Sequence, residues 1–169
     1  MKVAIYGGSF DPPHLGHYNL VLKAIQDLEI DKLIVLPNFQ NPWKEKTKFS
    51  PQKRFSLLQK LFSKFPKVEI SSFEIDNGYP TKTIESVQYF SKLYSKIYLI
   101  IGADNLAKLE LWDDYQEIIT KVEFVVAKRG NIKIDKKYKI IDIDFEISST
   151  DLRKSLDLEK IPSEIWEDI

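Results

Sequence analysis

The sequence predicts an α/β fold built on one doubly wound parallel sheet, in a single domain that spans residues 1–169. Short apolar runs rich in β-branched residues alternate with longer amphipathic stretches, a pattern typical of parallel strands joined by helices. A chain of 169 residues also fits one domain, and the sequence contains no internal repeat, low-complexity segment or linker that would separate a second one. One layered domain is therefore the simplest interpretation.

Six of the apolar runs are expected to form strands. The run at 97–101 contains only apolar and aromatic residues, as expected for a strand that is covered on both faces of the sheet. Pro37 ends the second run, because proline cannot donate to a strand ladder. The expected strands are 3–6, 33–36, 68–70, 97–101, 124–126 and 140–143.

The amphipathic stretches between these runs predict helices. Ser50 as N-cap and Pro51 at the first helical position mark the start of the second helix. Its apolar side chains recur at helical spacing and should share one face, namely Phe55, Leu58, Leu61 and Phe62. The expected helices are 15–28, one from 51 onward, 83–94, one near 113–119, and the tail from 150 to the end; turns are expected at 77–78 and 129–131.

Composition and charge disfavour several function classes. Twenty-five basic residues balance twenty-five acidic ones, which argues against a broad nucleic-acid or membrane surface. No apolar run approaches the roughly 20 residues of a membrane-spanning helix, and no signal peptide is recognisable. The absence of cysteine suits a reducing compartment. We therefore expect a soluble cytoplasmic protein with no nucleic-acid or membrane partner, and the sequence indicates no particular oligomeric state.

One glycine-rich loop follows the first strand and carries most of the chemical signal. Ligands of doubly wound sheets bind beyond the carboxyl ends of the strands, so the loops after Tyr6, Leu36, Ile101 and Ile143 should converge on one site. The first of these loops, residues 7–17, reads GGSFDPPHLGH. Its paired glycines let the backbone approach a phosphate, and the start of the next helix offers unpaired N–H groups to a triphosphate.

His14 and His17 are the only histidines in the chain, and one helical turn separates them. Both side chains can therefore point at a common anion. Two other interpretations stay open, a metal site, which would need a third ligand, and a structural helix cap. The loop lacks the G-x-G-x-x-G dinucleotide fingerprint and the Gly-Lys-Ser/Thr ending of a P-loop, so a dehydrogenase or a P-loop kinase is disfavoured.

The loop resembles a known signature. Residues 8–17 are similar to the GxFDPxHxGH pattern of the adenylyltransferase and cytidylyltransferase superfamily, and the chain most resembles its bacterial nicotinate-nucleotide adenylyltransferases. Four further segments match in the same order, namely 37–44, 78–83, 101–112 and 147–153. The resemblance implies a Rossmann-like fold of the HxGH type and transfer of AMP from ATP to nicotinate mononucleotide, with release of pyrophosphate, in NAD biosynthesis.

The resemblance also implies roles for particular residues. Those expected to support catalysis are His14, His17, Lys44 and Arg153. Those expected to bind ATP are Gly7, Gly8, Ser9, Phe10, His17, Gly102, Asp104, Ser148, Ser149, Thr150 and Arg153. Those expected to bind nicotinate mononucleotide are Ser9, Lys44, Thr81, Thr83 and Trp112. No residue is assigned to a metal, and Mg²⁺ is expected to accompany ATP through its phosphate oxygens and water.

Ordinary structural roles remain as alternatives for several of these residues. Lys44 could be solvated surface, Asp104 a helix cap and Trp112 part of the core. The hydroxyls at 148–150 could simply cap a helix, although capping does not explain Arg153, whose guanidinium can hold outgoing phosphates. We therefore treat the roles of these residues as hypotheses.

Pro80 departs from the family pattern. Members of the family usually carry a Tyr-Thr or similar pair before the second threonine, and Pro80 removes a backbone donor from that loop. If main-chain N–H groups hold the carboxylate of nicotinate there, Thr81 or Thr83 must preserve the geometry of the loop.

Alternative functions remain within the same superfamily and outside it. The acceptor could be nicotinamide mononucleotide, pantetheine phosphate or, with CTP, an alcohol phosphate. The chain could also be a nucleotide-binding regulator without turnover. Trp112 and residues 78–83 favour the nicotinate acceptor, and the set of His14, His17, Lys44 and Arg153 favours an enzyme.

Overall fold

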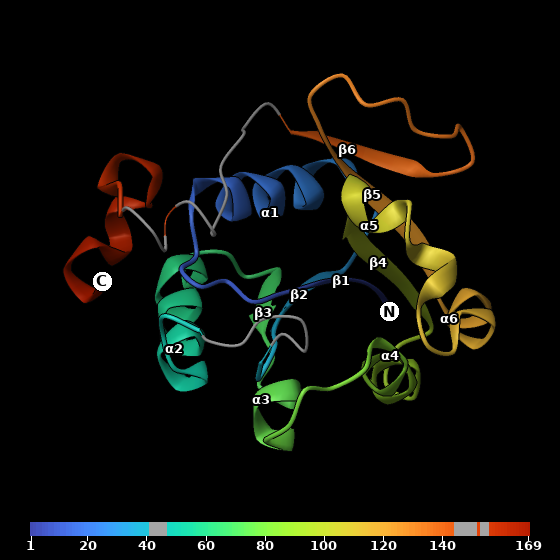
Figure 1. The fold of residues 1–169 in the computed structure, drawn as a ribbon, viewed down its shortest axis with the longest axis horizontal. Coiled ribbons are helices and arrows are strands. Elements are labelled where there is room, and N and C mark those ends of the chain that lie inside the picture. Colours follow the sequence, from blue (N-terminus) through green and yellow to red (C-terminus); the bar gives the residue numbers. More distant parts are fainter. Residues whose placement is uncertain (41–46, 144–151, 153–155) are drawn as a thin grey trace.

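The computed structural model describes residues 1–40, 47–143, 152 and 156–169. Its centre is a sheet of six parallel strands in the order β3-β2-β1-β4-β5-β6 (Figure 1). The chain builds one half outward from β1 and then returns to build the other half outward from β4, so the strand order reverses between these two strands. The doubly wound parallel sheet is therefore confirmed. The strands are β1 (Lys2–Gly8), β2 (Lys32–Pro37), β3 (Val68–Ile70), β4 (Lys96–Gly102), β5 (Glu123–Arg129) and β6 (Lys139–Ile143).

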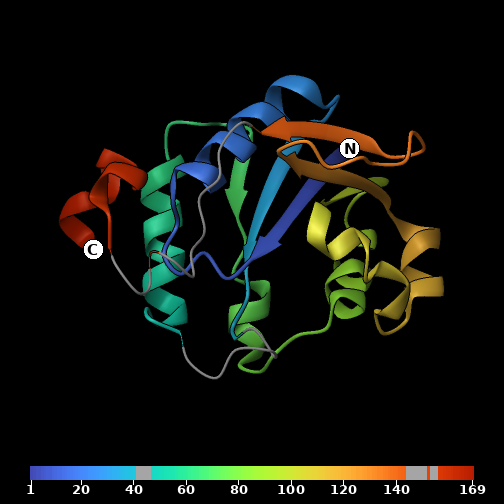
Figure 2. The same ribbon diagram turned by 45° about the horizontal axis from the view of Figure 1, so that its top comes forward.

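Helices cover both faces of this sheet (Figure 2). The first core cluster joins α1 (Leu15–Asp27) and α2 (Pro51–Phe62) to one face, together with Ile161 and Ile165 near the C-terminus. The second cluster joins α4 (Thr83–Ser91) and α6 (Tyr115–Lys121) to the other face. The remaining short helices are α3 (Phe73–Asn77), α5 (Ala103–Leu106) and the 3-10 helices η1 (Leu109–Leu111), η2 (Leu158–Lys160) and η3 (Ser163–Asp168).

The two clusters follow from the alternation of side chains along the strands. In β1, Ala4 belongs to the first cluster, whereas Val3 and Ile5 belong to the second. All three are buried. A strand covered on both sides in this way must be apolar throughout, which is why the continuous apolar runs in the sequence predicted the sheet correctly.

Several element boundaries differ from the prediction. The helix expected at 83–94 ends at Ser91, and the one expected near 113–119 is α6, which begins two residues later. The helix α3 was not predicted, because its five residues are too few to show a helical period. In the tail, the predicted helix is replaced over 158–168 by two 3-10 segments, while residues 150, 151 and 153–155 lie outside the described residues.

The buried face of α2 was also predicted incompletely. Leu58, Leu61 and Phe62 are buried as expected, but Phe55 is only half buried. The neighbouring residue Arg54 is fully buried instead. Its guanidinium donates hydrogen bonds to backbone carbonyl groups of adjacent loops, which compensates for burying the charge. A charged residue at this position gives no apolar signal.

Within the described ranges, the structure contains no helix that is both long enough and apolar enough to cross a membrane.

Candidate active site

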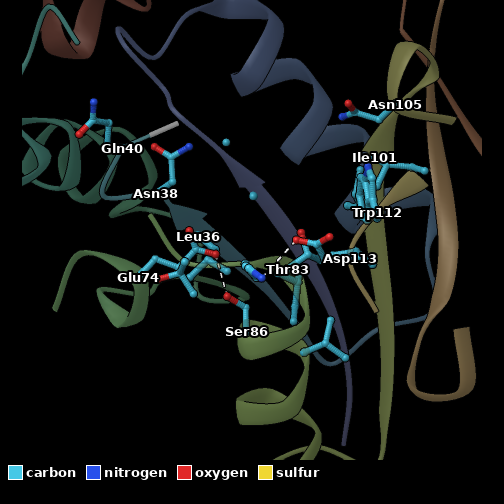
Figure 3. Close-up of a pocket in the computed structure, with 18 of the residues that line it drawn as sticks. Leu36, Asn38, Gln40, Glu74, Thr83, Ser86, Ile101, Asn105, Trp112 and Asp113 are labelled. Atoms are coloured by element: carbon cyan, nitrogen blue, oxygen red, sulfur yellow. Dashed lines mark hydrogen bonds and ion pairs between the residues drawn. The ribbon is translucent and has the colours of Figure 1, made fainter. Parts of the chain in front are cut away.

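A cavity of about 480 Å³ opens at the carboxyl ends of β1, β2 and β4, where the strand order reverses (Figure 3). The strands contribute Gly7 and Gly8 from β1, Leu36 from β2 and Ile101 from β4. Residues of α3, α4 and the segment after η1 complete its wall. The predicted convergence of the first three loops is confirmed at the place where sheets of this kind bind ligands. The fourth loop, after Ile143, lies outside the described residues.

His14 and His17 form a reciprocal cap at the start of α1. Nδ1 of His14 accepts hydrogen bonds from the backbone N–H groups of Gly16 at 3.0 Å and His17 at 3.3 Å. Nδ1 of His17 accepts one from the N–H of His14 at 3.1 Å, and the ring centroids of the two histidines are 3.6 Å apart. A neutral imidazole that accepts at Nδ1 carries its proton at Nε2. The two histidines therefore do cap the helix. Because Nδ1 accepts a hydrogen bond in each ring, Nε2–H remains as a donor on both rings.

His14 is held in the neutral form. The side chain is 1% exposed, and burial lowers its pKa from 6.5 to about 3, with a smaller contribution from the positive charge of Arg129. A neutral His14 can donate a hydrogen bond at pH 7 but contributes no full charge. Arg129, at the end of β5, was not recognised as a site residue from the sequence, where it was assigned only to a turn.

The loop before these histidines is held by buried polar groups. The Asp11 carboxylate accepts hydrogen bonds from the backbone N–H groups of Lys48 at 2.7 Å and Phe49 at 2.8 Å. Arg54 donates to the backbone carbonyl of Ser9 at 2.6 Å and to that of Phe39 at 2.8 Å. These bonds tie the loop to the segments on both sides of residues 41–46, so the backbone of the loop is fixed from several directions.

Gly8 and Phe10 act together within the loop. Phe10 has a positive φ of 50°, and its ring is 1% exposed in the core, with its centroid 4.8 Å from that of His17. A Cβ placed on Gly8 would lie 3.2 Å from this ring, so any other residue would press on the buried ring and require it to shift. The phenyl group therefore packs inside the protein.

Thr81, Thr83 and Trp112 line the cavity, as do Lys82 and Asp113. Asn77 donates to the Thr81 hydroxyl at 3.0 Å, which ties the loop before α4 to the end of α3. Lys82 and Asp113 form an ion pair of 3.2 Å that joins the start of α4 to the segment after η1. Trp112 is half buried and packs edge-on against Phe124, with ring centroids 6.4 Å apart, so it belongs both to the core and to the cavity wall.

The other predicted residues are placed as follows. Ser9 accepts a hydrogen bond from Asn38 at 3.3 Å next to the cavity. Gly102 and Asp104 are exposed at the start of α5, where no side chain caps the helix. A Cβ on Gly102 would meet no protein atom within 4 Å, so packing within the protein does not require glycine there. Lys44, Ser148, Ser149, Thr150 and Arg153 lie outside the described residues.

The polar residues of the cavity wall that were not predicted from the sequence include a buried pair, Glu74 and Ser86. The others are Asn38, Gln40, Lys82, Asn105 and Asp113. Glu74 and Ser86 are 8% and 3% exposed, and the Ser86 hydroxyl donates to the Glu74 carboxylate at 2.7 Å. Burial raises the pKa of Glu74 from 4.5 to about 7; the hydrogen bond from Ser86 lowers it, and the charge of Glu85 raises it further. No motif marks either residue, since α3 and α4 bring them together only in the folded chain.

Comparison with known proteins assigns a family to this geometry. The cytidylyltransferase-like family model matches residues 5–155. The chain is 45% identical over 171 residues to a probable nicotinate-nucleotide adenylyltransferase of Campylobacter jejuni, with 100% of this chain and 94% of the relative covered. It is 46% identical over 173 residues to a protein of the same name from Aliarcobacter butzleri, with 100% and 95% covered.

Solved structures resemble the fold over nearly the full length. A nicotinic acid mononucleotide adenylyltransferase of Plasmodium falciparum, complexed with NaAD, superimposes with a TM-score of 0.74 at 26% sequence identity, covering 94% of this chain and 85% of that one. The same enzyme complexed with APC gives a TM-score of 0.74 at 25% identity, covering 97% and 88%.

Proposed function

Because this chain belongs to the cytidylyltransferase-like family together with the nicotinate-nucleotide adenylyltransferases, we propose that it transfers AMP from ATP to nicotinate mononucleotide. The products are nicotinate adenine dinucleotide and pyrophosphate, in NAD biosynthesis. The observation that carries the proposal is the His14–His17 cap at the end of a loop whose first residues, Gly7 and Gly8, line the cavity at the switch point of the sheet. We place the reaction in the cytoplasm, where ATP is supplied.

ATP binds at the start of α1 in this proposal. The backbone of Gly7, Gly8, Ser9 and Phe10 approaches the phosphates, and the dipole of α1, a helix of 13 residues, favours their negative charge. Since its ring is buried, Phe10 acts through its backbone. Gly102 and Asp104 contact the nucleoside, and Arg153 and the hydroxyls at 148–150 hold the outer phosphates.

Nicotinate mononucleotide occupies the 480 Å³ cavity. The Trp112 ring offers a flat apolar surface for the pyridine, a contact with little loss of side-chain freedom. Thr81 and Thr83 surround its carboxylate end, and Ser9 and Lys44 contact its phosphate. The two substrates therefore meet at the loop that follows β1, whose residues Gly7 and Gly8 line the cavity, with the two reacting phosphates between them.

The reaction is a direct in-line attack without a covalent enzyme intermediate. A phosphate oxygen of nicotinate mononucleotide forms a bond to the α-phosphorus of ATP, while the bond from that phosphorus to the bridging oxygen of pyrophosphate breaks. The Nε2–H groups of His14 and His17 donate to the phosphate oxygens as negative charge develops, and Lys44 and Arg153 add positive charge. Phosphoryl chemistry of this kind depends mainly on positioning and charge stabilisation.

Mg²⁺ is proposed to enter with ATP. Across the described residues there is no group of three or more His, Asp or Glu side chains that could hold a metal ion. The proposal therefore assigns the ion to phosphate oxygens and water, which are the ligands that Mg²⁺ commonly keeps in nucleotide sites. Bound there, it would neutralise phosphate charge.

An acceptor panel tests the function. Pyrophosphate release is measured with Mg-ATP and, in parallel, nicotinate mononucleotide, nicotinamide mononucleotide, pantetheine phosphate or no acceptor. We expect strong release only with the nicotinate form. Preference for another acceptor would keep the mechanism but contradict the substrate, and no release with any acceptor would indicate a nucleotide-binding regulator.

A further inference from the structure

Glu74 is a buried carboxyl group in the wall of the acceptor cavity, and the mechanism above gives it no role. Figure 3 shows it opposite Trp112 and Asp113, with its hydrogen bond to Ser86 on the cavity side of α4. A buried carboxyl group is costly to keep ionised. Its place beside a substrate that itself carries a carboxylate therefore requires an explanation.

The net charge of the described cavity wall depends on whether Glu74 is protonated. The lining residues include one cation, Lys82, and two carboxyl groups, Glu74 and Asp113. Lys82 and Asp113 neutralise each other in their 3.2 Å ion pair. The described residues of the wall therefore sum to zero charge when Glu74 is protonated and to one negative charge when Glu74 is ionised.

We propose that Glu74 is a specificity-determining residue, whose protonated form admits the carboxylate of the acceptor and whose ionised form repels it, an inference that rests on the proposed function. The protonated group has an O–H that can donate to a carboxylate, whereas the ionised group can only accept. The amide group of nicotinamide mononucleotide has both an N–H donor and a carbonyl acceptor, so it can bind next to Glu74 whether Glu74 is ionised or protonated. Selection of acid over amide should therefore weaken as Glu74 ionises.

The surroundings of Glu74 support ionisation within the working pH range. Its burial raises the pKa to about 7, and a second carboxylate brought next to it raises the pKa further, because like charges disfavour ionisation. Among the described residues, the other charged groups around the cavity, on α3 and α4, and on the neighbouring strand β2 are Lys82, Glu85, Asp113, Asp76 and Lys32. The Glu85 carboxylate accepts hydrogen bonds from the Tyr79 hydroxyl and from the N–H of Lys82. Lys32 forms an ion pair with Glu69.

The first test is the pH dependence of acceptor selection. KM and kcat are measured for nicotinate and nicotinamide mononucleotides from pH 6 to 9. The two acceptors carry the same phosphate, so titration of the phosphate cancels in the ratio of their KM values. We expect the KM for the nicotinate form to rise by about tenfold per pH unit above the Glu74 midpoint, relative to the nicotinamide form. The ratio of kcat values should stay nearly constant.

Three variants separate Glu74 from other titrating groups. Glu74→Gln should make the KM ratio independent of pH. Ser86→Ala removes the hydrogen bond that lowers the pKa, so it should move the midpoint to higher pH, a shift that a purely structural role would not produce. Asp76→Asn removes an exposed carboxylate from the same helix and should leave the wild-type profile unchanged.

A second measurement uses the wild-type protein alone. Calorimetric binding at pH 8, with a non-hydrolysable ATP analogue present and in buffers of different ionisation enthalpy, reports protons taken up with the acceptor. We expect net uptake with nicotinate mononucleotide and less with the nicotinamide form. A KM ratio that does not change with pH, or equal proton uptake for both ligands, would overturn the inference while leaving the proposed function intact. No turnover with either mononucleotide would overturn the proposed function and this inference together.

Discussion

His17 uses the two nitrogens of one ring for different purposes. Nδ1 accepts the N–H of His14 in the helix cap, and Nε2–H is assigned to the phosphates. An Asn or a Gln side chain can accept the N–H of His14 in place of Nδ1, but only Gln is long enough to reach the position of Nε2. The two substitutions can therefore separate folding from chemistry.

We expect His17→Asn to unfold near the wild-type temperature but to lose turnover by about a hundredfold, because it lacks the donor at Nε2. His17→Gln should also keep the cap, because Gln at the third helical position can accept the N-cap N–H, and should keep more of the turnover. Thermal unfolding and pyrophosphate release check the pair. Turnover of the Asn variant within twofold of wild type would refute the assignment.

His14 makes the stability depend on pH. Its pKa is about 3 in the folded protein and 6.5 when unfolded, so the unfolded chain binds more protons between these values. The stabilisation is complete above pH 6.5 and is lost as the pH falls below it. Glu74, with its pKa raised to about 7, has the opposite slope between pH 4.5 and 7.

Comparison with His14→Asn isolates the histidine, because Asn can still cap the helix but does not titrate, and Glu74 is present in both proteins. Urea unfolding at pH 7, 6 and 5 should show the wild type losing about 1 kcal/mol per pH unit relative to the variant. Parallel pH curves would show that His14 is not held neutral by burial.

At the scale of elements, α2 is joined to the motif loop through one buried side chain. Arg54 is fully buried, and its guanidinium donates to the carbonyls of Ser9 and Phe39. Burial lowers its pKa, while the nearby Asp11 charge raises it. Removing such a group leaves the two carbonyl groups without this donor in a dry environment and takes a positive charge away from Asp11.

Arg54→Leu should therefore lower the free energy of unfolding by about 3 kcal/mol and also reduce ATP affinity, since the loop at 8–11 loses its support. Gln52→Leu, an exposed position on the same helix, should change stability by less than about 0.5 kcal/mol. Urea unfolding of both variants checks this. Equal stability of the two variants would show that Arg54 does not hold the loop.

Sequence patterns predicted the long elements better than the short ones. The strands and α1, α2 and α4 were visible because continuous apolar runs and a period of 3.6 extend over many residues. The helix α3 has five residues, and tertiary contacts rather than periodicity decide its conformation. The site shows the same division. His14 and His17 lie in one contiguous motif, whereas Glu74 and Ser86 come together only when α3 and α4 pack.

For the whole molecule, one sheet is shared by both core clusters, and this should make unfolding cooperative. Ile165 belongs to the first cluster and Ile118 to the second, and both are fully buried. Either face of the sheet is exposed to water if the cluster covering it opens. The domain is therefore expected to unfold as one unit.

Ile118→Ala and Ile165→Ala should each lower the same single unfolding transition, by about 3 kcal/mol. Calorimetric scans, compared with the van't Hoff enthalpy, check the cooperativity. Exposed Ile140→Ala serves as a control that should leave the transition nearly unchanged. Two transitions, each moved by only one of the core variants, would show that the two faces unfold independently.

The central claim is adenylyl transfer from ATP to nicotinate mononucleotide, and the fate of the α-phosphate tests it most directly. The protein is incubated with nicotinate mononucleotide and ATP that carries a radioactive label in its α-phosphate, and the products are separated. We predict that the label enters a dinucleotide while unlabelled pyrophosphate is released, and that neither happens without the acceptor. Label that stays in ATP, or that leaves as free AMP with the acceptor unchanged, would contradict the claim.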